Sequence, residues 1–230
     1  MKNVFFLFLF FAIISCNAQT DSLTKVNPGE FEKAIIGGNV QVLDVRTAGE
    51  FTSGHIRHAL WADWNDKKQF NERIQYVDKD IPVYIYCLVG GRSAAAADWM
   101  RKNGFMNVTE LQGGLNAWKT ENKPLEGMGN EKQMTLEEYW ARIPKDKTVL
   151  VDFGATWCPP CIKMEPVLGE LQSIKGLNFL LVKVDGGIHT NVMKELIVES
   201  IPVFIIYKNG KESWRKAGIV SREELLEQLR

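Results

Sequence analysis

The sequence has few cysteines and no surplus of charge of either sign. Four cysteines in 230 residues are too few for a disulfide-stabilised scaffold of this size. Lys and Arg together number 28, and Asp and Glu also number 28, so the formal net charge is zero. A nucleic-acid-binding protein normally carries a basic excess. We therefore expect no nucleic-acid partner, and the 45% of hydrophobic residues is ordinary for a globular protein.

Long hydrophobic runs are also scarce, and the longest one lies at the start of the chain. Residues 4–14 are all apolar and follow Lys2, but this run is shorter than the about 20 residues that a bilayer-spanning helix needs. A basic start, a short apolar run and then small or polar residues are typical of a secretory signal peptide. The sequence therefore predicts a signal-peptide region over residues 1–16 and export from the cytoplasm.

Residues 13–16, Ile-Ile-Ser-Cys, resemble the lipobox of bacterial lipoproteins. This resemblance implies lipidation at Cys16, and soluble export after an ordinary cleavage is the alternative. We expect a periplasmic protein that is attached to the membrane only through a lipid anchor.

The polar segment over residues 121–133 divides the rest of the chain. It contains Pro124, Gly127 and Gly129 and has no helical or strand periodicity, which is typical of a linker. It predicts a first domain over residues 24–120 and a second domain over residues 134–230.

Short apolar strands alternate with helices in both predicted domains, which is typical of α/β folds. In the first, the continuous apolar run over residues 83–87 suits a buried parallel sheet. In the second, we expect a strand over residues 177–184, a helix from Thr190 to residue 199, and a hairpin over residues 203–217 around Asn-Gly. The fold class is therefore two α/β domains, the first with a parallel sheet and the second with a mixed sheet.

Cys158 and Cys161 lie where a predicted strand over residues 148–153 gives way to a helix. Free N–H groups at a helix N-terminus stabilise a thiolate, so Cys158 is the expected attacking sulfur and Cys161 the resolving one. Because Pro159 and Pro160 have no N–H, fewer donors reach Cys158, which favours a reductase over an oxidase. A zinc site and a structural disulfide are the alternatives. With no second pair of cysteines, we expect no metal ion and no cofactor.

Residues 151–161, Val-Asp-Phe-Gly-Ala-Thr-Trp-Cys-Pro-Pro-Cys, resemble the active-site strand and loop of the thioredoxin family. Residues 201–203 and 208–210 resemble the later proline loop and hairpin of the same fold. The resemblance implies that Trp157 shields the site and that Pro202 is cis beside the sulfurs.

The same resemblance implies that Asp152 is a buried carboxylate that accepts a proton from Cys161. Burial raises the pKa of such a group, so it can exchange protons near neutrality. An aspartate paired with a lysine is the alternative. The chain departs from some family members, which carry a buried lysine, at Leu181, although Lys183 is close.

Cys87 stands alone in a loop that follows an apolar strand and precedes a helix. No proline interrupts residues 88–92, so their five N–H groups can curl around the sulfur and stabilise a thiolate, a persulfide or a bound oxyanion. Gly90 and Gly91 allow the left-handed turns that this needs. A buried and inert cysteine is the alternative. We expect the sulfur of Cys87, like that of Cys158, to be ionised and reachable at neutral pH.

The loop Cys-Leu-Val-Gly-Gly-Arg-Ser resembles that of rhodanese-family sulfurtransferases. Other landmarks of that family match residues 43–46, 50–51, 54–56 and 113–118. The resemblance implies that Cys87 forms a persulfide and that Arg92 orients the loop or the substrate. We assign Asp44, Arg46 and His55 to framework hydrogen bonds.

Two details of this loop bear on its substrate. Four residues separate Cys87 from Arg92, one fewer than in phosphatases of related fold, which favours sulfur transfer over phosphoryl hydrolysis. Leu88 and Val89 are apolar where many relatives have polar or basic residues. A dianionic donor such as thiosulfate gains less there than a neutral-tailed persulfide or thiol does.

The sequence thus indicates an exported thiol–disulfide oxidoreductase with a persulfide-forming cysteine domain. One hypothesis couples the domains, with Cys158 attacking a persulfide on Cys87 and sulfide leaving as the Cys158–Cys161 pair closes. Alternatively, the chain is a general reductase whose first domain is a binding or redox-sensing module, or a membrane-tethered adaptor without activity. The expected partners are protein disulfide clients, a small sulfur donor and a membrane thiol carrier that supplies electrons.

Overall fold

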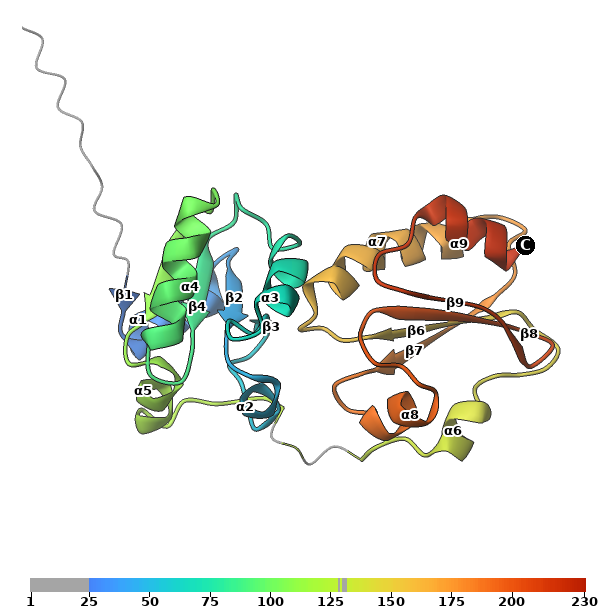
Figure 1. Ribbon diagram of the computed structural model, residues 1–230, viewed down its shortest axis with the longest axis horizontal. Coiled ribbons are helices and arrows are strands. Elements are labelled where there is room, and N and C mark those ends of the chain that lie inside the picture. The colour runs from blue at the N-terminus through green and yellow to red at the C-terminus, as the bar shows by residue number, and fades with distance from the viewer. Residues whose placement is uncertain (1–24, 128, 130–131) are drawn as a thin grey trace, which may run out of the picture.

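The computed structural model describes residues 25–127, 129 and 132–230 of the chain. The predicted signal-peptide region, including Cys16, lies outside these residues. The described residues form two α/β domains (Figure 1), which confirms the predicted fold class. No helix in the described part of the chain is long and apolar enough to cross a membrane.

The first domain has a five-stranded sheet in the order β1-β5-β4-β2-β3, and all its pairs are parallel. Its elements are β1 (Lys25–Val26), α1 (Pro28–Gly37), β2 (Gln41–Asp44), α2 (Ala48–Thr52), β3 (Leu60–Trp61), α3 (Lys67–Ile74), β4 (Val83–Tyr86), α4 (Gly91–Lys102), β5 (Val108–Leu111) and α5 (Gly114–Thr120). Side chains alternate along a strand, so Val42 packs with α1 and α5 while Leu43 packs with α3 and α4. The sheet is therefore covered on both faces.

The second domain has a four-stranded mixed sheet in the order β7-β6-β8-β9. Its elements are α6 (Leu136–Trp140), β6 (Val149–Gly154), α7 (Pro159–Ser173), β7 (Leu180–Asp185), α8 (Thr190–Glu195), β8 (Val203–Lys208), β9 (Lys211–Ala217) and α9 (Arg222–Leu229). Helices α7 and α9 cover one face, and α6 and α8 lie on the other (Figure 1). Alternation along β6 places Leu150 in the core beneath α7, so Asp152 points to the same face.

Two predicted elements of the second domain have different bounds. The helix expected to run from Thr190 to residue 199 ends at Glu195, and its N-cap is His189 and not Thr190. It stops because Ile197 adopts a left-handed backbone with φ of 55°. The strand expected over residues 177–184 begins only at Leu180, where pairing with β6 starts.

The two domains meet where α3 approaches the first turns of α7 (Figure 1). The Trp61 amide of β3 also donates a hydrogen bond to the Trp157 carbonyl, just before α7, at 2.9 Å. The start of the predicted linker packs on the first domain, since Glu126 exchanges two backbone hydrogen bonds with His55. The site described next lies at this junction.

Candidate active site

Cys158 and Cys161 form a disulfide at the start of α7. Cys158 is the N-cap of the helix, with an extended backbone, and the Cys161 amide donates to Cys158 Sγ at 3.4 Å. The N2 and N3 amides normally reach an N-cap side chain. Here N2 is Pro160, so among the described residues only one amide of the first turn donates to this sulfur. Because Pro159 and Pro160 have no amide hydrogen, fewer amides donate to the Cys158 sulfur, as expected from the sequence.

The loop before β8 closes the other side of the disulfide. The Ile201–Pro202 peptide bond is cis, and the Ile201 carbonyl oxygen lies 3.8 Å from Cys158 Sγ. Pro202 is therefore placed beside the sulfurs.

Asp152 lies behind the disulfide and is only 6% exposed. A Cβ added at Gly154 would be 3.2 Å from Asp152 Oδ1 and 3.5 Å from Cys161 Cβ, so both groups border the same small gap. Burial raises the pKa of Asp152 to about 6, Lys183 opposes this rise and Glu165 adds to it. Lys183 forms its ion pair with Glu165, and in the described part of the chain no hydrogen bond or ion pair reaches the Asp152 carboxylate.

Cys87 follows β4 in a second strand-to-helix loop. Its sulfur accepts a hydrogen bond from the Gly90 amide at 3.1 Å and from the Ser93 hydroxyl at 3.5 Å. Gly90 has a φ of 110°, which only glycine adopts without strain. Burial raises the pKa of Cys87, but hydrogen bonds from Ser93, Gly90 and Val89 outweigh burial and lower it overall. The loop therefore favours a thiolate.

The start of α5 holds the outer side of the Cys87 loop. The Leu115 amide donates to the Cys87 carbonyl at 2.8 Å, and the Asn116 amide donates to the Leu88 carbonyl at 3.0 Å. Gly114 makes this approach feasible, because a Cβ there would lie 2.5 Å from the Cys87 carbonyl oxygen. With their carbonyls bound outside, the loop residues can turn their amides toward the sulfur.

Arg92 is bound to α2 and does not contact the sulfur. Its guanidinium donates to both carboxylate oxygens of Glu50, at 2.7 and 2.6 Å. The Arg92 hydrogen bonds, assisted by Thr47, lower the pKa of Glu50 to about 2. Arg92 thus links the start of α4 to α2, and its role in orienting the loop or the substrate stays a prediction.

The sequence resembles known proteins in two separate parts. A model of the thioredoxin family matches residues 130–230, and a model of the rhodanese-like domain matches residues 27–121. The thioredoxin of Mycolicibacterium smegmatis is 39% identical over 89 residues, which cover 38% of this chain and 80% of that protein. The chain belongs to the thioredoxin family. Its order of a rhodanese-like domain followed by a thioredoxin domain confirms the predicted one.

Other relatives are longer than the matched region. Chloroplastic thioredoxin Y of Oryza sativa subsp. japonica is 37% identical over 99 residues, 43% of this chain and 59% of that protein. The chain thus spans little more than half the length of that relative. A solved rhodanese-related protein from Thermoplasma volcanium is 25% identical, with a TM-score of 0.40, over 45% of this chain and 97% of its own. The thioredoxin relatives support a thiol–disulfide oxidoreductase.

The structure gathers the predicted site residues into two groups. One group lies in the thioredoxin domain and consists of the Cys158–Cys161 disulfide with Asp152, Trp157 and Pro202 near it. The other group lies in the loop of the rhodanese-like domain and consists of Cys87, Gly90 and Arg92. Among the described residues, no bond joins the two sulfur sites. Cys87 is 1% exposed and Cys158 is 0% exposed, so the expectation that both sulfurs are reachable is wrong for this arrangement.

Trp157, the residue before Cys158, contacts the other domain. Its ring packs edge-on against Trp61 and Phe51, with centroids 5.6 and 5.5 Å apart, and the Arg73 guanidinium lies 5.3 Å from its ring. We missed these three partners, since they come from three separate elements. Their only sequence signal is Phe51, which belongs to a landmark of the rhodanese family.

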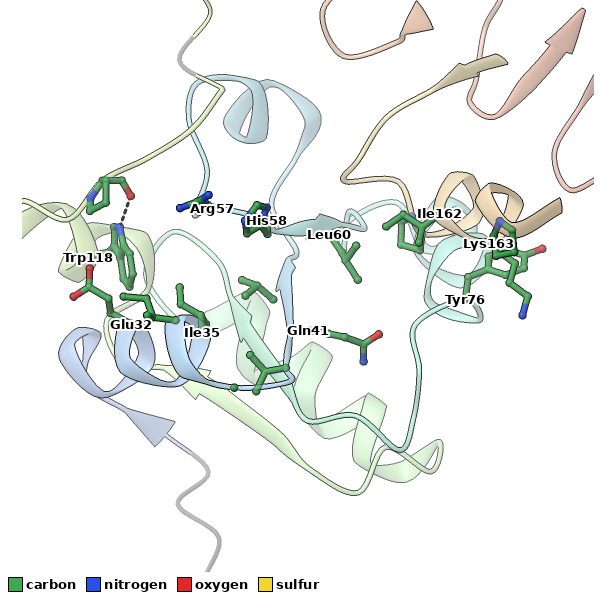
Figure 2. A pocket seen from close by; sticks show the side chains of 17 residues that line it. Glu32, Ile35, Gln41, Arg57, His58, Leu60, Tyr76, Trp118, Ile162 and Lys163 are labelled. Atoms are coloured by element: carbon green, nitrogen blue, oxygen red, sulfur yellow. Dashed lines mark hydrogen bonds between the residues drawn. The ribbon is translucent and has the colours of Figure 1, made fainter. Parts of the chain in front are cut away.

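A cavity of about 860 Å³ runs beside this contact (Figure 2). Trp118 and Glu32 lie at one end, Ile162 and Lys163 of α7 lie at the other, and Leu60 lies between them. Both domains therefore line the cavity, and Pro159 brings it next to the disulfide.

The residues that we assigned to framework hydrogen bonds contact the surrounding fold. Arg46 and Asp44 form a buried ion pair at 2.6 Å, and Arg46 also donates to the Gly54 carbonyl. His55 stacks on Phe51 with 3.9 Å between ring centroids. Ser93 binds the Cys87 sulfur and Glu50 binds Arg92, and we did not single out either residue, although Glu50 is part of a family landmark.

Proposed function

We propose that the chain is a thiol–disulfide reductase in which Cys158 attacks client disulfides and Cys161 resolves the product. The observation that carries this proposal is the Cys158–Cys161 disulfide at a helix N-terminus with a protonatable Asp152 behind it. The matched thioredoxins support the same chemistry.

The reaction proceeds in two exchanges. The Cys158 thiolate attacks one sulfur of the client disulfide and forms a mixed disulfide, and the other client sulfur leaves as a thiolate. Asp152 then accepts the proton of the Cys161 thiol, and the Cys161 thiolate attacks Cys158 Sγ. The second client thiolate leaves, and the two electrons of the dithiol are now in the client. A membrane thiol carrier is the proposed source of electrons for the next turnover.

We propose that Cys87 carries sulfur as a persulfide. Gly90 and Ser93 donate to its sulfur and stabilise the anion that accepts the sulfur atom. Val89, at the rim of the loop, is 63% exposed and apolar. A small donor with a neutral tail, such as an organic persulfide, fits this rim better than thiosulfate does.

The two activities can be coupled through one sulfur atom. The Cys158 thiolate attacks the outer sulfur of the Cys87 persulfide, and the Cys87 thiolate leaves. The Cys161 thiolate then attacks Cys158 Sγ, the disulfide closes and hydrosulfide is released, so the sulfane sulfur gains the two electrons that the dithiol loses. The domains must first reorient, because both sulfurs are buried in the docked arrangement.

A second candidate is a general reductase whose rhodanese-like domain only binds or senses. One observation that favours it is the contact of Phe51, Trp61 and Arg73 with Trp157. Another is the ion pair of Arg92 with Glu50, which occupies the guanidinium that a substrate would otherwise bind. In that case Cys87 transfers no sulfur.

Three assays separate these functions. Insulin reduction driven by dithiothreitol should fall at least about 100-fold in Cys158→Ser and stay unchanged in Cys87→Ala. Sulfur transfer from a persulfide to cyanide should be lost in Cys87→Ala and stay unchanged in Cys158→Ser. If Cys87→Ala loses no sulfur transfer, the second candidate is favoured. In a single turnover, the wild type should discharge persulfidated Cys87 faster than Cys158→Ser does, and equal rates would refute coupling.

We further propose that the chain is exported and anchored through a lipid on Cys16. The apolar run over residues 4–14 and the Ile-Ile-Ser-Cys sequence support this proposal. The intact mass of the protein from its native source should include the lipid and begin at Cys16. A mass that begins after a later cleavage would favour soluble export.

A further inference from the structure

The residue next to the attacking cysteine is bound by the other domain. Phe51 of α2, Trp61 of β3 and Arg73 of α3 surround Trp157, and we call these three residues the Trp157 cage. The Arg73 guanidinium lies 4.5 Å from the Trp61 ring and 5.3 Å from the Trp157 ring. No carboxylate forms an ion pair with Arg73 in the described part of the chain, so its partners are these two rings and the Trp61 carbonyl oxygen.

A backbone hydrogen bond joins the two domains at the same place. β3 is an edge strand, and the outward polar groups of an edge strand need partners. The Trp61 amide donates to the Trp157 carbonyl at 2.9 Å, and the Trp61 carbonyl accepts from Arg73 at 3.2 Å. The thioredoxin domain therefore completes the sheet edge with the carbonyl that immediately precedes Cys158.

The reactive sulfur beside this contact is buried. Disulfide exchange needs a thiolate to approach the attacked sulfur directly, and Cys158 is 0% exposed. We infer that the rhodanese-like domain is a removable cover for the disulfide site, held by the Trp157 cage, and that it must leave before Cys158 exchanges with another sulfur. Arg73 is thus a positioning residue that acts through Trp157. The inference rests on the proposed reactivity of Cys158.

The interface has the properties of one that opens. It is not filled, since the cavity of about 860 Å³ lies between α7 and the rhodanese-like domain (Figure 2). A cation–π contact and a few aromatic contacts are weak enough for thermal opening. Contacts between domains of one chain permit relative motion unless they are large and apolar.

The experiment measures how fast dithiothreitol reduces the disulfide of the oxidised full chain. One dithiothreitol thiolate attacks Cys158, Cys161 leaves as a thiolate, and the second dithiothreitol sulfur displaces Cys158 as the reagent closes into its cyclic disulfide. Samples are quenched with iodoacetamide, and the peptide that carries Cys158 and Cys161 is quantified by mass spectrometry. The rate reports the fraction of time that the site is open.

Two variants weaken the cage, and one variant of the same helix is the control. Arg73→Ala and Trp61→Leu should each raise the rate about tenfold, and Arg73→Lys should restore part of the wild-type protection. Lys67→Ala removes a cation of α3 that lies over Trp64 and not over Trp157, and it should leave the rate unchanged. Rates within about twofold of wild type in both cage variants would overturn the inference.

A second measurement needs no variant. The Trp61 amide of the oxidised wild type should exchange its hydrogen slowly, because its partner is the Trp157 carbonyl. Exchange at the rate of a free amide would overturn the docked arrangement even if a cage variant failed to fold. A wild type that leaves insulin intact would refute the proposed function alone, since the dithiothreitol rate depends on access to Cys158 and not on a client.

Discussion

The chain contains two sulfurs at the same kind of position, and the two loops treat them differently. Cys87 directly follows the buried strand β4, Cys158 follows the buried strand β6 after three residues, and each precedes a helix. Cys87 is followed by three residues before α4 begins, and the Gly90 amide and Ser93 hydroxyl reach its sulfur. Cys158 is followed at once by the helix, and one amide reaches its sulfur.

The difference shows how local sequence selects sulfur chemistry. Glycines let a loop curl so that several donors converge on one anion, which suits a sulfur that remains singly charged or carries a persulfide. Prolines withhold donors and keep the helix start rigid, which leaves the thiolate less stabilised and favours return to the disulfide. A cysteine between a strand and a helix can thus hold a stable anion or donate electrons, depending on the residues that follow it.

The largest expected effect comes from the glycine behind the Cys87 loop. Gly114→Ala would place a Cβ 2.5 Å from the Cys87 carbonyl oxygen at a φ of 61°. We expect the rhodanese-like domain to lose about 3 kcal/mol of stability, from overpacking and backbone strain. Displacing the loop by about 1 Å should lower sulfur transfer about 100-fold. Urea unfolding and the cyanide assay measure the two effects.

A neighbouring glycine supplies the control for this substitution. A Cβ at Gly91 meets nothing within 4 Å, and Gly91 begins a helix, so Gly91→Ala should be neutral or slightly stabilising. Insulin reduction should be unchanged in both variants, because the Cys158 loop is not touched. Normal sulfur transfer by Gly114→Ala would show that the loop geometry is not what activates Cys87.

The next effect concerns the acid behind the disulfide. The pKa of Asp152 is raised from 3.8 to about 6, so the folded state binds a proton more tightly than the unfolded state does. The free energy of unfolding should therefore fall by about 2 kcal/mol as pH rises from about 4 to about 6, and by about 3 kcal/mol over the whole titration from below pH 3 to above pH 7. Asp152→Asn should lose this pH dependence and be more stable than wild type above pH 7.

Urea unfolding at acid and neutral pH tests this prediction. The exposed Asp146 of the same domain provides the control, and Asp146→Asn should retain the wild-type pH dependence. Asp152→Asn should also slow the resolving attack by Cys161 at neutral pH. A variant that is less stable than wild type above pH 7 would mean that the carboxylate is stabilised by partners and not penalised by burial.

A smaller effect should follow from restoring an amide beside Cys158. Pro160→Ala provides an N–H at the N2 position, where it can donate to the Cys158 thiolate. One such hydrogen bond is worth about 1 kcal/mol, which makes the reduction potential less negative by about 20 mV. Pro159→Ala restores the N1 amide, which points away from the N-cap side chain, and should shift the potential less. Equal shifts would refute the donor-counting explanation.

Elements with local signals were predictable from the sequence. The hairpin strands β8 and β9 follow from Asn-Gly after the apolar run over residues 203–207, and the start of α1 has a local signal in Asn27 and Pro28, whose cap the structure contains. β1 and β3 have two residues each and no periodicity of their own. They exist because a neighbouring strand pairs with them, which depends on the tertiary fold and not on local sequence.

The candidate site divides in the same way. Cys158, Cys161 and Cys87 stand out because their donors lie within six residues along the chain. The Trp157 cage does not stand out in the sequence, because Phe51, Trp61 and Arg73 become neighbours of Trp157 only when the two domains dock. Burial of Cys87 in the core of the first domain and burial of Cys158 near the domain contact both depend on residues distant in the sequence, which is why the expectation of reachable sulfurs was wrong.

The smallest expected effect tests whether the donors around Cys87 act as proposed. The Ser93 hydroxyl lies 3.5 Å from Cys87 Sγ and 3.1 Å from the Gly90 carbonyl oxygen, so one hydrogen is shared between two acceptors. Ser93→Ala should raise the pKa of Cys87 by up to about one unit, because a hydrogen bond to the thiolate is lost. Thiolate absorbance at 240 nm against pH measures this in a Cys16→Ser chain with the Cys158–Cys161 disulfide intact, where Cys87 alone titrates as a thiol. Gly91→Ala should give the wild-type curve, and an unchanged curve in Ser93→Ala would leave the backbone amides as the main source of the lowered pKa.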